Sequence, residues 1–264
     1  MSQWGRAYIP KPEHGAAWIT GASTGIGRAV ALRLAADGWT VYATARNEAK
    51  LESLCAEAGE HIIPAPGDVT DAEAMVRIVK RIEGAQGLAL AIFNAGVYEP
   101  MRAQDFTAKA AAMHFDVNLQ GVANGLAPAM RGMIARKTGC LALVASVAGY
   151  RGLPKAAAYG ATKAALINMA EALAYDLHPA GVRISVINPG FVETDATAVN
   201  DFDMPFLMQT DEAAERIVSG LKTTAIEIAL PRRFAIILKT MRFLPTRAYL
   251  WLGRKAMGWD KIDD

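Results

Sequence analysis

The chain has 264 residues, of which 52% are hydrophobic, enough for one large core, and it contains no linker that would divide it into two domains. Its 28 Lys and Arg residues nearly balance its 26 Asp and Glu residues, which argues against bulk electrostatic attraction to nucleic acid. Cys55 and Cys140 give neither a disulfide framework nor a metal-ligand spacing, so we expect a reducing cytoplasm and no metal site.

Residues 1–14 are predicted to form a flexible arm, because they contain Pro10 and Pro12 and show no periodicity. They lack the apolar core of a signal peptide, and no later run approaches the roughly 18 apolar residues of a membrane-spanning helix. We therefore expect a cytoplasmic protein whose only route to a membrane is a peripheral contact.

A phosphate site is predicted near the N-terminus. Residues 16–20 read as a short apolar strand, and residues 28–38 read as an amphipathic helix that a glycine closes. Between them, Gly21, Gly25 and Gly27 would let the backbone pass close to a pyrophosphate, while the helix N-terminus offers free N–H groups. The alternative is a plain strand-to-helix turn.

The second predicted strand, residues 40–45, is followed directly by Arg46. In this kind of fold the adenosine ribose of a dinucleotide arrives at that position, where an acidic residue binds the ribose 2′-hydroxyl and an arginine pairs with a 2′-phosphate. No carboxylate occurs until Glu48, so the sequence favours NADP(H), with NAD(H) as the second choice. The alternative is a solvated arginine at the start of a helix.

A third strand is predicted within residues 61–68, ending at Asp68, and a helix over residues 71–84, with Asp71 at its N-terminus. The continuous apolar run 88–93 is typical of a parallel strand covered on both faces.

A long helical stretch over residues 108–130 carries Asn118 in its interior. An Asn inside a helix is usually a neutral surface residue. Alternatively, its amide holds a water molecule or a backbone group in the site.

Residues 140–146 are predicted to form a buried strand that ends at Ser146, and residues 158–177 a helix. Tyr159 and Lys163 are four residues apart in this helix, so they share a face, and a neighbouring ammonium favours the phenolate. The pair would make a tunable proton donor and acceptor, and the glycine-containing loop would return the Ser146 hydroxyl toward the phenol. A chance pair on an exposed helix face is the alternative.

The remaining elements are strands within residues 183–188 and 227–231, separated by a mobile lid over residues 191–210 and a helix over residues 211–223. Strands and helices thus alternate along the whole chain. This alternation predicts a single-domain α/β fold, a doubly wound parallel sheet of about seven strands with helices on both faces and its ligand at the carboxyl ends of the strands.

Over residues 14–230 these motifs resemble the short-chain dehydrogenase/reductase family, whose fold is of the Rossmann type. Residues 20–27 resemble its cofactor turn T-G-x-x-x-G-x-G, residues 68–69 its adenine contact, and residues 189–194 the segment that holds the nicotinamide amide. Residues 93–96 resemble N-N-A-G, with Phe93 in place of the first Asn, a departure that weakens one structural hydrogen bond rather than the chemistry. The catalytic tetrad of the family matches Asn118, Ser146, Tyr159 and Lys163.

The resemblance implies hydride transfer between a nicotinamide and a carbonyl or alcohol carbon, in a homodimer or homotetramer. Tyr159 would donate a proton to the carbonyl oxygen, and Ser146 would orient that oxygen. Lys163 would lower the phenol pKa and bind the ribose, and Asn118 would hold a water molecule. The implied cofactor-binding residues are Gly21, Ser23, Thr24, Gly25, Ile26, Gly27, Arg46, Asp68, Val69, Asn94, Ala95, Gly96, Tyr159, Lys163, Pro189, Gly190, Val192 and Thr194. Many NADP-dependent relatives carry a further basic residue at the position of Thr24, which leaves the preference for NADP(H) incomplete.

The substrate is predicted to be a hydrophobic aldehyde or ketone, or the matching alcohol. An apolar pocket would be lined by Tyr98, Tyr150, Leu153, Phe191 and the lid residues Phe202, Phe206 and Leu207. The alternative is that these side chains only pack the lid against the protein.

Residues 231–264 form an extension that is basic and apolar at once, after an arm over residues 1–14 and a catalytic domain over residues 15–230. Its broadly helical spacing would suit the interface of an anionic membrane, a cover over the substrate pocket or a second subunit. It resembles the tails of relatives that reduce retinal-like and lipid-derived aldehydes.

Three other functions are compatible with the sequence. The first is an NAD-linked dehydrogenase of a hydroxysteroid or an aromatic secondary alcohol. The second is a non-catalytic protein that binds the cofactor, against which the complete tetrad argues. The third is a membrane-interface protein in which the extension is the main functional feature.

Overall fold

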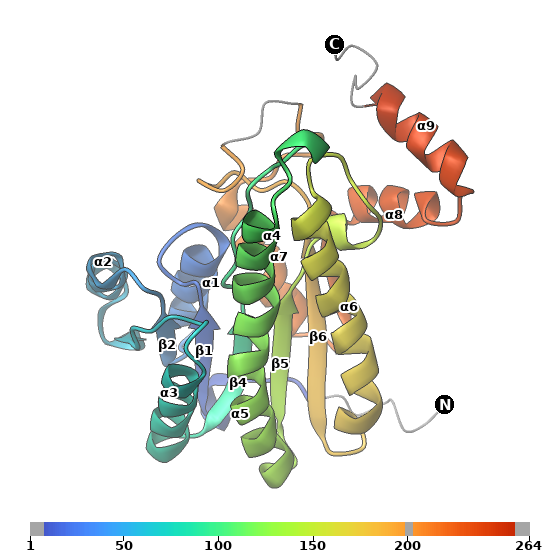
Figure 1. The fold of residues 1–264 in the computed structure, drawn as a ribbon. Helices are drawn as coiled ribbons and strands as arrows, with labels where there is room; N and C mark the ends of the chain where they lie inside the picture. The colour runs from blue at the N-terminus through green and yellow to red at the C-terminus, as the bar shows by residue number, and fades with distance from the viewer. Residues whose placement is uncertain (1–7, 199–202, 257–264) are drawn as a thin grey trace.

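The computed structural model describes residues 8–198 and 203–256. Its centre is a seven-stranded sheet with the strand order β3-β2-β1-β4-β5-β6-β7, in which every neighbouring pair is parallel (Figure 1). The strands are β1 (Ala16–Thr20), β2 (Val41–Thr44), β3 (Ile62–Pro64), β4 (Leu88–Phe93), β5 (Gly139–Val144), β6 (Val182–Pro189) and β7 (Glu227–Leu230). The predicted doubly wound parallel sheet is confirmed.

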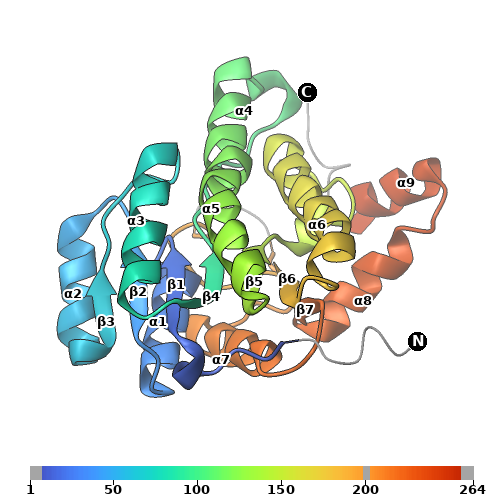
Figure 2. The ribbon, with the colours of Figure 1, turned by 90° about the horizontal axis from the view of Figure 1, so that it is seen from below.

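Helices cover both faces of this sheet, as the view along the strands shows (Figure 2). On one face lie α3, α4, α5 and α6, and on the other lie α1 and α7, with α2 at the edge next to β3. The helices are α1 (Gly25–Ala36), α2 (Glu48–Ala58), α3 (Ala72–Ala85), α4 (Ala108–Phe115), α5 (Gly121–Arg136), α6 (Ala157–Leu177), α7 (Thr210–Leu221), α8 (Arg232–Met241) and α9 (Thr246–Ala256).

Alternating strand residues supply two separate hydrophobic cores. In β1, Ala17 and Ile19 face the core under α1 and α7, while Ala16 and Trp18 face the core under α3, α5 and α6. Both faces are covered, so the strands are apolar throughout rather than alternating. Phe93 packs edge-on against Trp18, with ring centroids 5.6 Å apart. At the position of the first Asn of N-N-A-G, this chain therefore buries an aromatic ring, which stabilises the fold by about 2 kcal/mol, instead of forming a polar contact.

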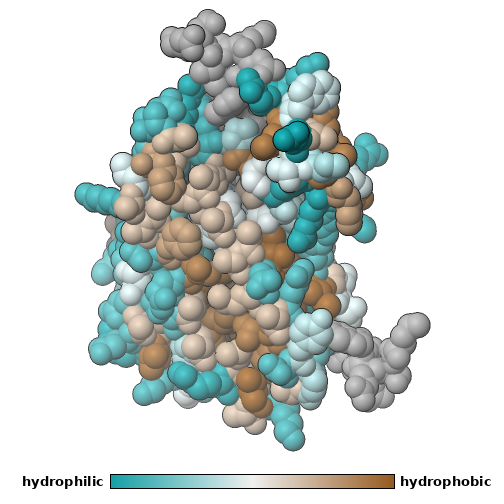
Figure 3. Space-filling model, turned by 45° about the vertical axis from the view of Figure 1, so that its right-hand side comes forward, coloured by the Kyte–Doolittle hydropathy of each residue, from teal (hydrophilic) through white to brown (hydrophobic). Residues whose placement is uncertain are grey.

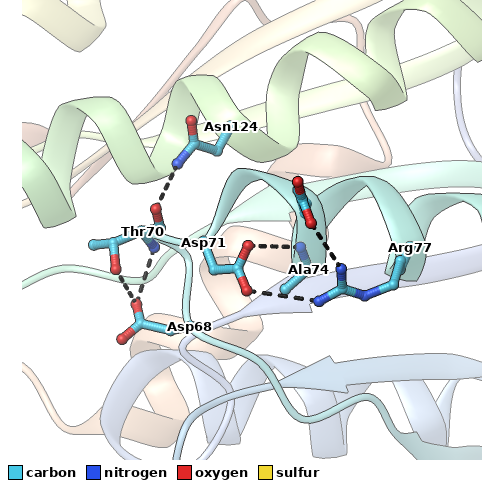
Figure 4. A network of polar contacts seen from close by, with 7 residues as sticks. Asp68, Thr70, Asp71, Ala74, Arg77 and Asn124 are labelled. Carbon is cyan, nitrogen blue, oxygen red and sulfur yellow. Dashed lines mark hydrogen bonds and ion pairs between the residues drawn. The ribbon is translucent and has the colours of Figure 1, made fainter.

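Two of the predicted elements differ most from those observed. The third strand ends at Pro64 rather than at Asp68, because the Asp68 carboxylate accepts bonds from the N–H and hydroxyl of Thr70 and folds the chain into a turn. Figure 4 shows this turn, and it also shows Asp71 at the N-cap of α3, where it accepts from the N–H of Ala74 as predicted. The predicted helix over residues 108–130 is interrupted by a π-helical turn, Asp116–Gln120, which separates α4 from α5.

Both terminal segments are attached to the domain. Of the predicted N-terminal arm, the structure describes residues 8–14, where Pro12–His14 form a short 3-10 helix and Tyr8 packs against the core. At the other end, α8 and α9 lie at the outer edge of the sheet, on the side of the strands' carboxyl ends (Figure 1). None of the described helices is both long enough and apolar enough to cross a bilayer.

Candidate active site

A cavity of about 660 Å³ lies at the carboxyl ends of the strands. It extends from the turn between β1 and α1, past the ends of β2 and β4, to the end of β5 and the start of α6. The strand order reverses between β1 and β4, and α/β sheets bind their ligands in the crevice at such a reversal.

One end of the cavity has the features of a phosphate site. Gly21 has φ +67°, and a Cβ atom there would lie 2.7 Å from the Cα of Ala95, so only glycine fits. No side chain caps the N-terminus of α1 at Thr24, and its first turn contains no acidic residue. The N–H groups at this end are therefore available to an anion, and Gly21, Ser23, Thr24, Gly25 and Ile26 all line the cavity.

Asn94 holds the glycine turn in place. Its side-chain N–H₂ donates to the carbonyls of Thr20, at 3.2 Å, and Gly21, at 3.0 Å, while its own N–H donates to the Thr20 hydroxyl. Asn94, Ala95 and Gly96 line the cavity as predicted.

Gly27 was predicted to bind the cofactor, but it lies behind the turn and does not line the cavity. A Cβ atom at Gly27 would lie 2.2 Å from the carbonyl oxygen of Gly21 and 2.4 Å from Nδ2 of Asn94. Because Gly27 has no Cβ atom, α1 can pack closely against the glycine turn.

We expect Gly27→Ala to lower the free energy of unfolding by about 2 kcal/mol or more, because the added methyl group overlaps backbone that cannot move freely. Chemical denaturation measures this change. The matched control is Gly84→Ala, in the exposed side of α3 with open space around it, which should raise stability by up to about 1 kcal/mol. Equal effects of the two substitutions would contradict the packing role of Gly27.

The second end of the cavity is lined by Arg46, Asp68 and Val69. Arg46 is exposed, two residues after the end of β2. The side chain of Asn124 on α5 fixes the backbone of residues 69 and 70, because it donates to both carbonyls, and Figure 4 shows the bond to Thr70. The residues predicted to contact the adenosine part of a dinucleotide therefore all line this cavity.

The third part of the cavity brings Ser146, Tyr159 and Lys163 together. The Ser146 hydroxyl follows β5, forms a hydrogen bond with the Tyr159 phenol and accepts from the N–H of Ala148 at 3.1 Å. The ring of Tyr98 packs edge-on against Tyr159, with centroids 4.9 Å apart.

The expected effect of Lys163 on the phenol pKa is wrong for this structure. Burial raises the pKa of Tyr159 to about 12, which the hydrogen bond with Ser146 only partly offsets. The Lys163 ammonium donates to the carbonyl of Val144 at 2.7 Å and lies 5.5 Å from the centroid of the Tyr159 ring. Burial lowers the pKa of Lys163 to about 8. The phenol is thus neutral and protonated at physiological pH.

The lowered Lys163 pKa predicts a pH-dependent stability. Between about pH 8 and pH 10 the unfolded chain binds more protons at this lysine than the folded protein, so folding stability rises with pH. Over this interval wild type should gain up to about 3 kcal/mol relative to Lys163→Met. Denaturation curves at each pH measure the difference. Lys80→Met, at an exposed position of α3, should change with pH as wild type does, and parallel curves for wild type and Lys163→Met would contradict the expectation.

Asn118 is fully buried in the π-helical turn, so the surface alternative is wrong, and it does not line the cavity. Its Oδ1 accepts from the N–H of Val97 at 2.7 Å, and its Nδ2 donates to the Val97 carbonyl at 2.9 Å. Asn118 thus holds the backbone that follows β4, beside Gly96 and Lys163. Its binding of a water molecule stays a prediction.

Pro189, Gly190, Val192 and Thr194 also line the cavity, and the Ser146 hydroxyl donates to the Pro189 carbonyl at 3.3 Å. Thr197, which sequence reasoning missed, fixes this segment, because its hydroxyl donates to the Val192 carbonyl at 2.6 Å and accepts from the Thr194 N–H at 3.0 Å. The signal that could have found it is a hydroxyl residue three positions after Thr194, in a loop with no other regular structure.

The predicted apolar pocket forms only in part. Tyr98, Leu153 and Phe191 line the cavity, but the Tyr150 hydroxyl donates to Oε1 of Glu227 at 2.6 Å, outside it. Phe206 and Leu207 are exposed and do not line the cavity.

Phe206 instead packs against Phe234 of α8, with ring centroids 5.6 Å apart, while Phe202 lies outside the described residues. Small apolar residues that were not predicted complete the wall around the tetrad: Val97, Val117, Val144, Ala145, Val147, Ala148, Pro154 and Ala156.

The sequence model of the short chain dehydrogenase family matches residues 15–204. An uncharacterized oxidoreductase of Myxococcus xanthus is 39% identical over 233 residues, which cover 87% of this chain and 92% of the relative. The 2,3-dihydro-2,3-dihydroxybenzoate dehydrogenase of Bacillus subtilis is 35% identical over 212 residues, 77% of each chain.

Among solved structures, a short-chain dehydrogenase of Sphingobium yanoikuyae in complex with NADPH shares the fold, with a TM-score of 0.76 and 23% identity over 88% of this chain and 97% of that one. The family match covers most of the chain, including the glycine turn, Asn118, Ser146, Tyr159 and Lys163. This protein is therefore a member of the short-chain dehydrogenase family and an NAD(P)-dependent oxidoreductase.

Proposed function

We propose that this protein reduces hydrophobic aldehydes or ketones with NADPH, or oxidises the matching alcohols with NADP⁺. The observation that carries the proposal is that one cavity is lined by Arg46, by the phosphate-binding glycine turn, and by Ser146, Tyr159 and Lys163. A dinucleotide is an extended molecule with phosphates in its middle, so its parts match this order of features.

The residues present fit such a cofactor. The pyrophosphate would lie at the uncapped N-terminus of α1, beside the cavity residues Gly21 and Gly25, and Arg46 would bind the 2′-phosphate with charge-assisted hydrogen bonds. Asp68 and Val69 would flank the adenine. The reduced nicotinamide supplies the hydride. The NADPH complex of the Sphingobium protein supports this choice.

The side chains at the other end supply the proton. Because the pKa of Tyr159 is raised to about 12 by burial, its phenol stays protonated at neutral pH and would donate its proton to the oxygen of the substrate carbonyl. Ser146 would donate a second hydrogen bond to that oxygen and stabilise its developing negative charge. Lys163, at 2.7 Å from the Val144 carbonyl, would bind the cofactor ribose and restore the proton through the water that Asn118 is predicted to hold.

The part of the cavity near Tyr159 favours an apolar substrate, because it is lined by Tyr98, Leu153 and Phe191 and by several valine and alanine side chains. The dehydrogenase relative from Bacillus subtilis favours a second candidate, the NAD-linked oxidation of a cyclic secondary alcohol. Whether the protein binds NADPH or NADH more tightly distinguishes the proposed carbonyl reductase from this NAD-linked alcohol dehydrogenase.

A series of straight-chain aldehydes tests the proposal. We expect NADPH consumption, followed at 340 nm, with kcat/KM rising about fourfold for each added CH₂ until the apolar wall is covered. A polar aldose of similar length is the matched control and should react poorly. If kcat/KM does not change with the chain length of the aldehyde, or if the protein reduces NAD⁺ faster with secondary alcohols, the proposal of a hydrophobic aldehyde or ketone substrate is contradicted.

We also propose that the chain forms a homo-oligomer through the helices α4, α5 and α6. Large apolar side chains are exposed there, among them Met113, Phe115, Ile134 and Tyr175, and Figure 3 shows tan and brown atoms gathered over a broad area of this side. Light scattering of the purified protein measures the mass, and a monomer at micromolar concentration would contradict this proposal.

A further inference from the structure

We propose that the outward surface of α8 and α9 docks on the interface of an anionic phospholipid bilayer. This C-terminal surface consists of exposed apolar residues (Ile236, Ile237, Phe243, Leu250, Trp251, Leu252) and exposed basic residues (Arg232, Arg233, Arg242, Arg247, Lys255). The inference does not depend on the reaction that the cavity catalyses.

The two helices are firmly held by their inner faces. Phe234 and Ala235 are buried against the domain, and Tyr249 is buried with its hydroxyl donating to the Gly152 carbonyl at 2.7 Å. Arg151 donates to the carbonyl of Leu244 at 2.9 Å and stacks on the Tyr249 ring at 4.1 Å. The outward side chains are therefore presented by a fixed support rather than by a loose tail.

The apolar part of the surface is unusually exposed. Phe243 is 87% exposed at the junction of the two helices, and Leu250 and Trp251 of α9 are 57% and 56% exposed. Large aromatic and aliphatic side chains in one contiguous segment mark an interaction site more often than scattered surface residues do. Figures 1 and 2 show this segment at the outer edge of the molecule, with α9 standing clear of the sheet.

The basic part identifies the partner. No acidic residue occurs in the sequence between Glu227 and Asp260. Within the described ranges, Arg232, Arg233, Arg242 and Arg247 form no ion pair, whereas Lys239 is paired with Glu227. Apolar side chains flanked by unpaired arginines complement a bilayer surface that is negative at the headgroups and apolar beneath them. In Figure 3, teal and brown atoms are mixed over this upper part of the molecule.

A second copy of the chain fits this surface less well. A two-fold contact would place the same arginines against one another, where like charges repel. The helices, at 10 and 11 residues, are suited to lying in the plane of the interface. The surface also adjoins the cavity, because Phe234 of α8 stacks on the cavity residue Phe191, with centroids 5.8 Å apart.

Co-sedimentation of the full chain with vesicles tests the proposal. We expect it to bind vesicles that contain phosphatidylglycerol, to bind vesicles of phosphatidylcholine alone at least about tenfold more weakly, and to lose binding as salt is added. The combined variant Arg233→Glu, Arg242→Glu and Arg247→Glu should weaken binding by about 100-fold or more.

The matched control is Lys11→Glu, Lys50→Glu and Lys80→Glu, which changes the net charge equally at exposed positions before β1, on α2 and on α3 and should bind within about twofold of wild type. A second variant, Phe243→Ser with Trp251→Ser, tests the apolar contribution at constant charge and should also weaken binding. Circular dichroism confirms that each variant is folded.

Three results would overturn the proposal. They are equal or absent binding to both vesicle types, equal losses in the arginine variant and its control, and self-association that the arginine variant abolishes without any vesicle binding. The last result would identify a second copy as the occupant.

Discussion

Tyr159→Phe is expected to lower kcat by about 10³-fold, while NADPH binding changes by less than about threefold. The substitution removes only the hydroxyl that is proposed to donate the proton and leaves the ring, which packs against Tyr98. Steady-state turnover of an aliphatic aldehyde gives kcat, and cofactor fluorescence gives the dissociation constant of NADPH.

Tyr175→Phe is the matched control, because it removes a hydroxyl from the same helix at a position that is 74% exposed. It should leave both constants unchanged. A Tyr159→Phe enzyme that keeps its turnover, or one that loses NADPH binding together with turnover, would contradict the role of Tyr159 as the proton donor.

Arg46→Ala is expected to weaken NADPH binding by about 10- to 100-fold and to leave NADH binding within about twofold of wild type. The reason is that the guanidinium would contact only the 2′-phosphate, which NADH lacks. Fluorescence titration of both cofactors on both proteins measures the four dissociation constants.

Lys50→Ala controls for a general loss of positive charge, since this exposed lysine lies on α2 close to the same end of the cavity. It should weaken NADPH binding only slightly. If Arg46→Ala weakens both cofactors equally, or neither, the 2′-phosphate assignment fails and the NAD-linked oxidation of a secondary alcohol becomes the better candidate.

The sequence predicted the fold well where one local signal was sufficient. Residues 16–20 and 88–93 are strands with the predicted bounds, because continuous apolar runs beside glycine or asparagine have no competing structure. Spacing and the resemblance also predicted that Ser146, Tyr159 and Lys163 lie together, and the structure brings these three residues into one cavity.

The sequence failed where a contact spans distant parts of the chain. Tyr150 looked like an apolar wall, yet its hydroxyl binds Glu227, a residue 77 positions away that also accepts from Asn188 and pairs with Lys239 of α8. The sequence also did not show that Tyr159 is buried. Burial raises the pKa of its phenol, whereas we expected Lys163 to lower it. The substrate class also stays a prediction, because the sequence does not show whether the lid closes on the cavity.

The most direct test of the account is to follow the hydride itself. NADPH deuterated at both positions of C4 is incubated with the protein and a medium-chain aldehyde, and the alcohol is examined by mass spectrometry. We predict an alcohol with one deuterium on its carbinol carbon, formed by wild type and Tyr175→Phe and almost absent with Tyr159→Phe. An alcohol without deuterium, or no alcohol from any carbonyl compound although NADPH binds, would contradict hydride transfer at this site.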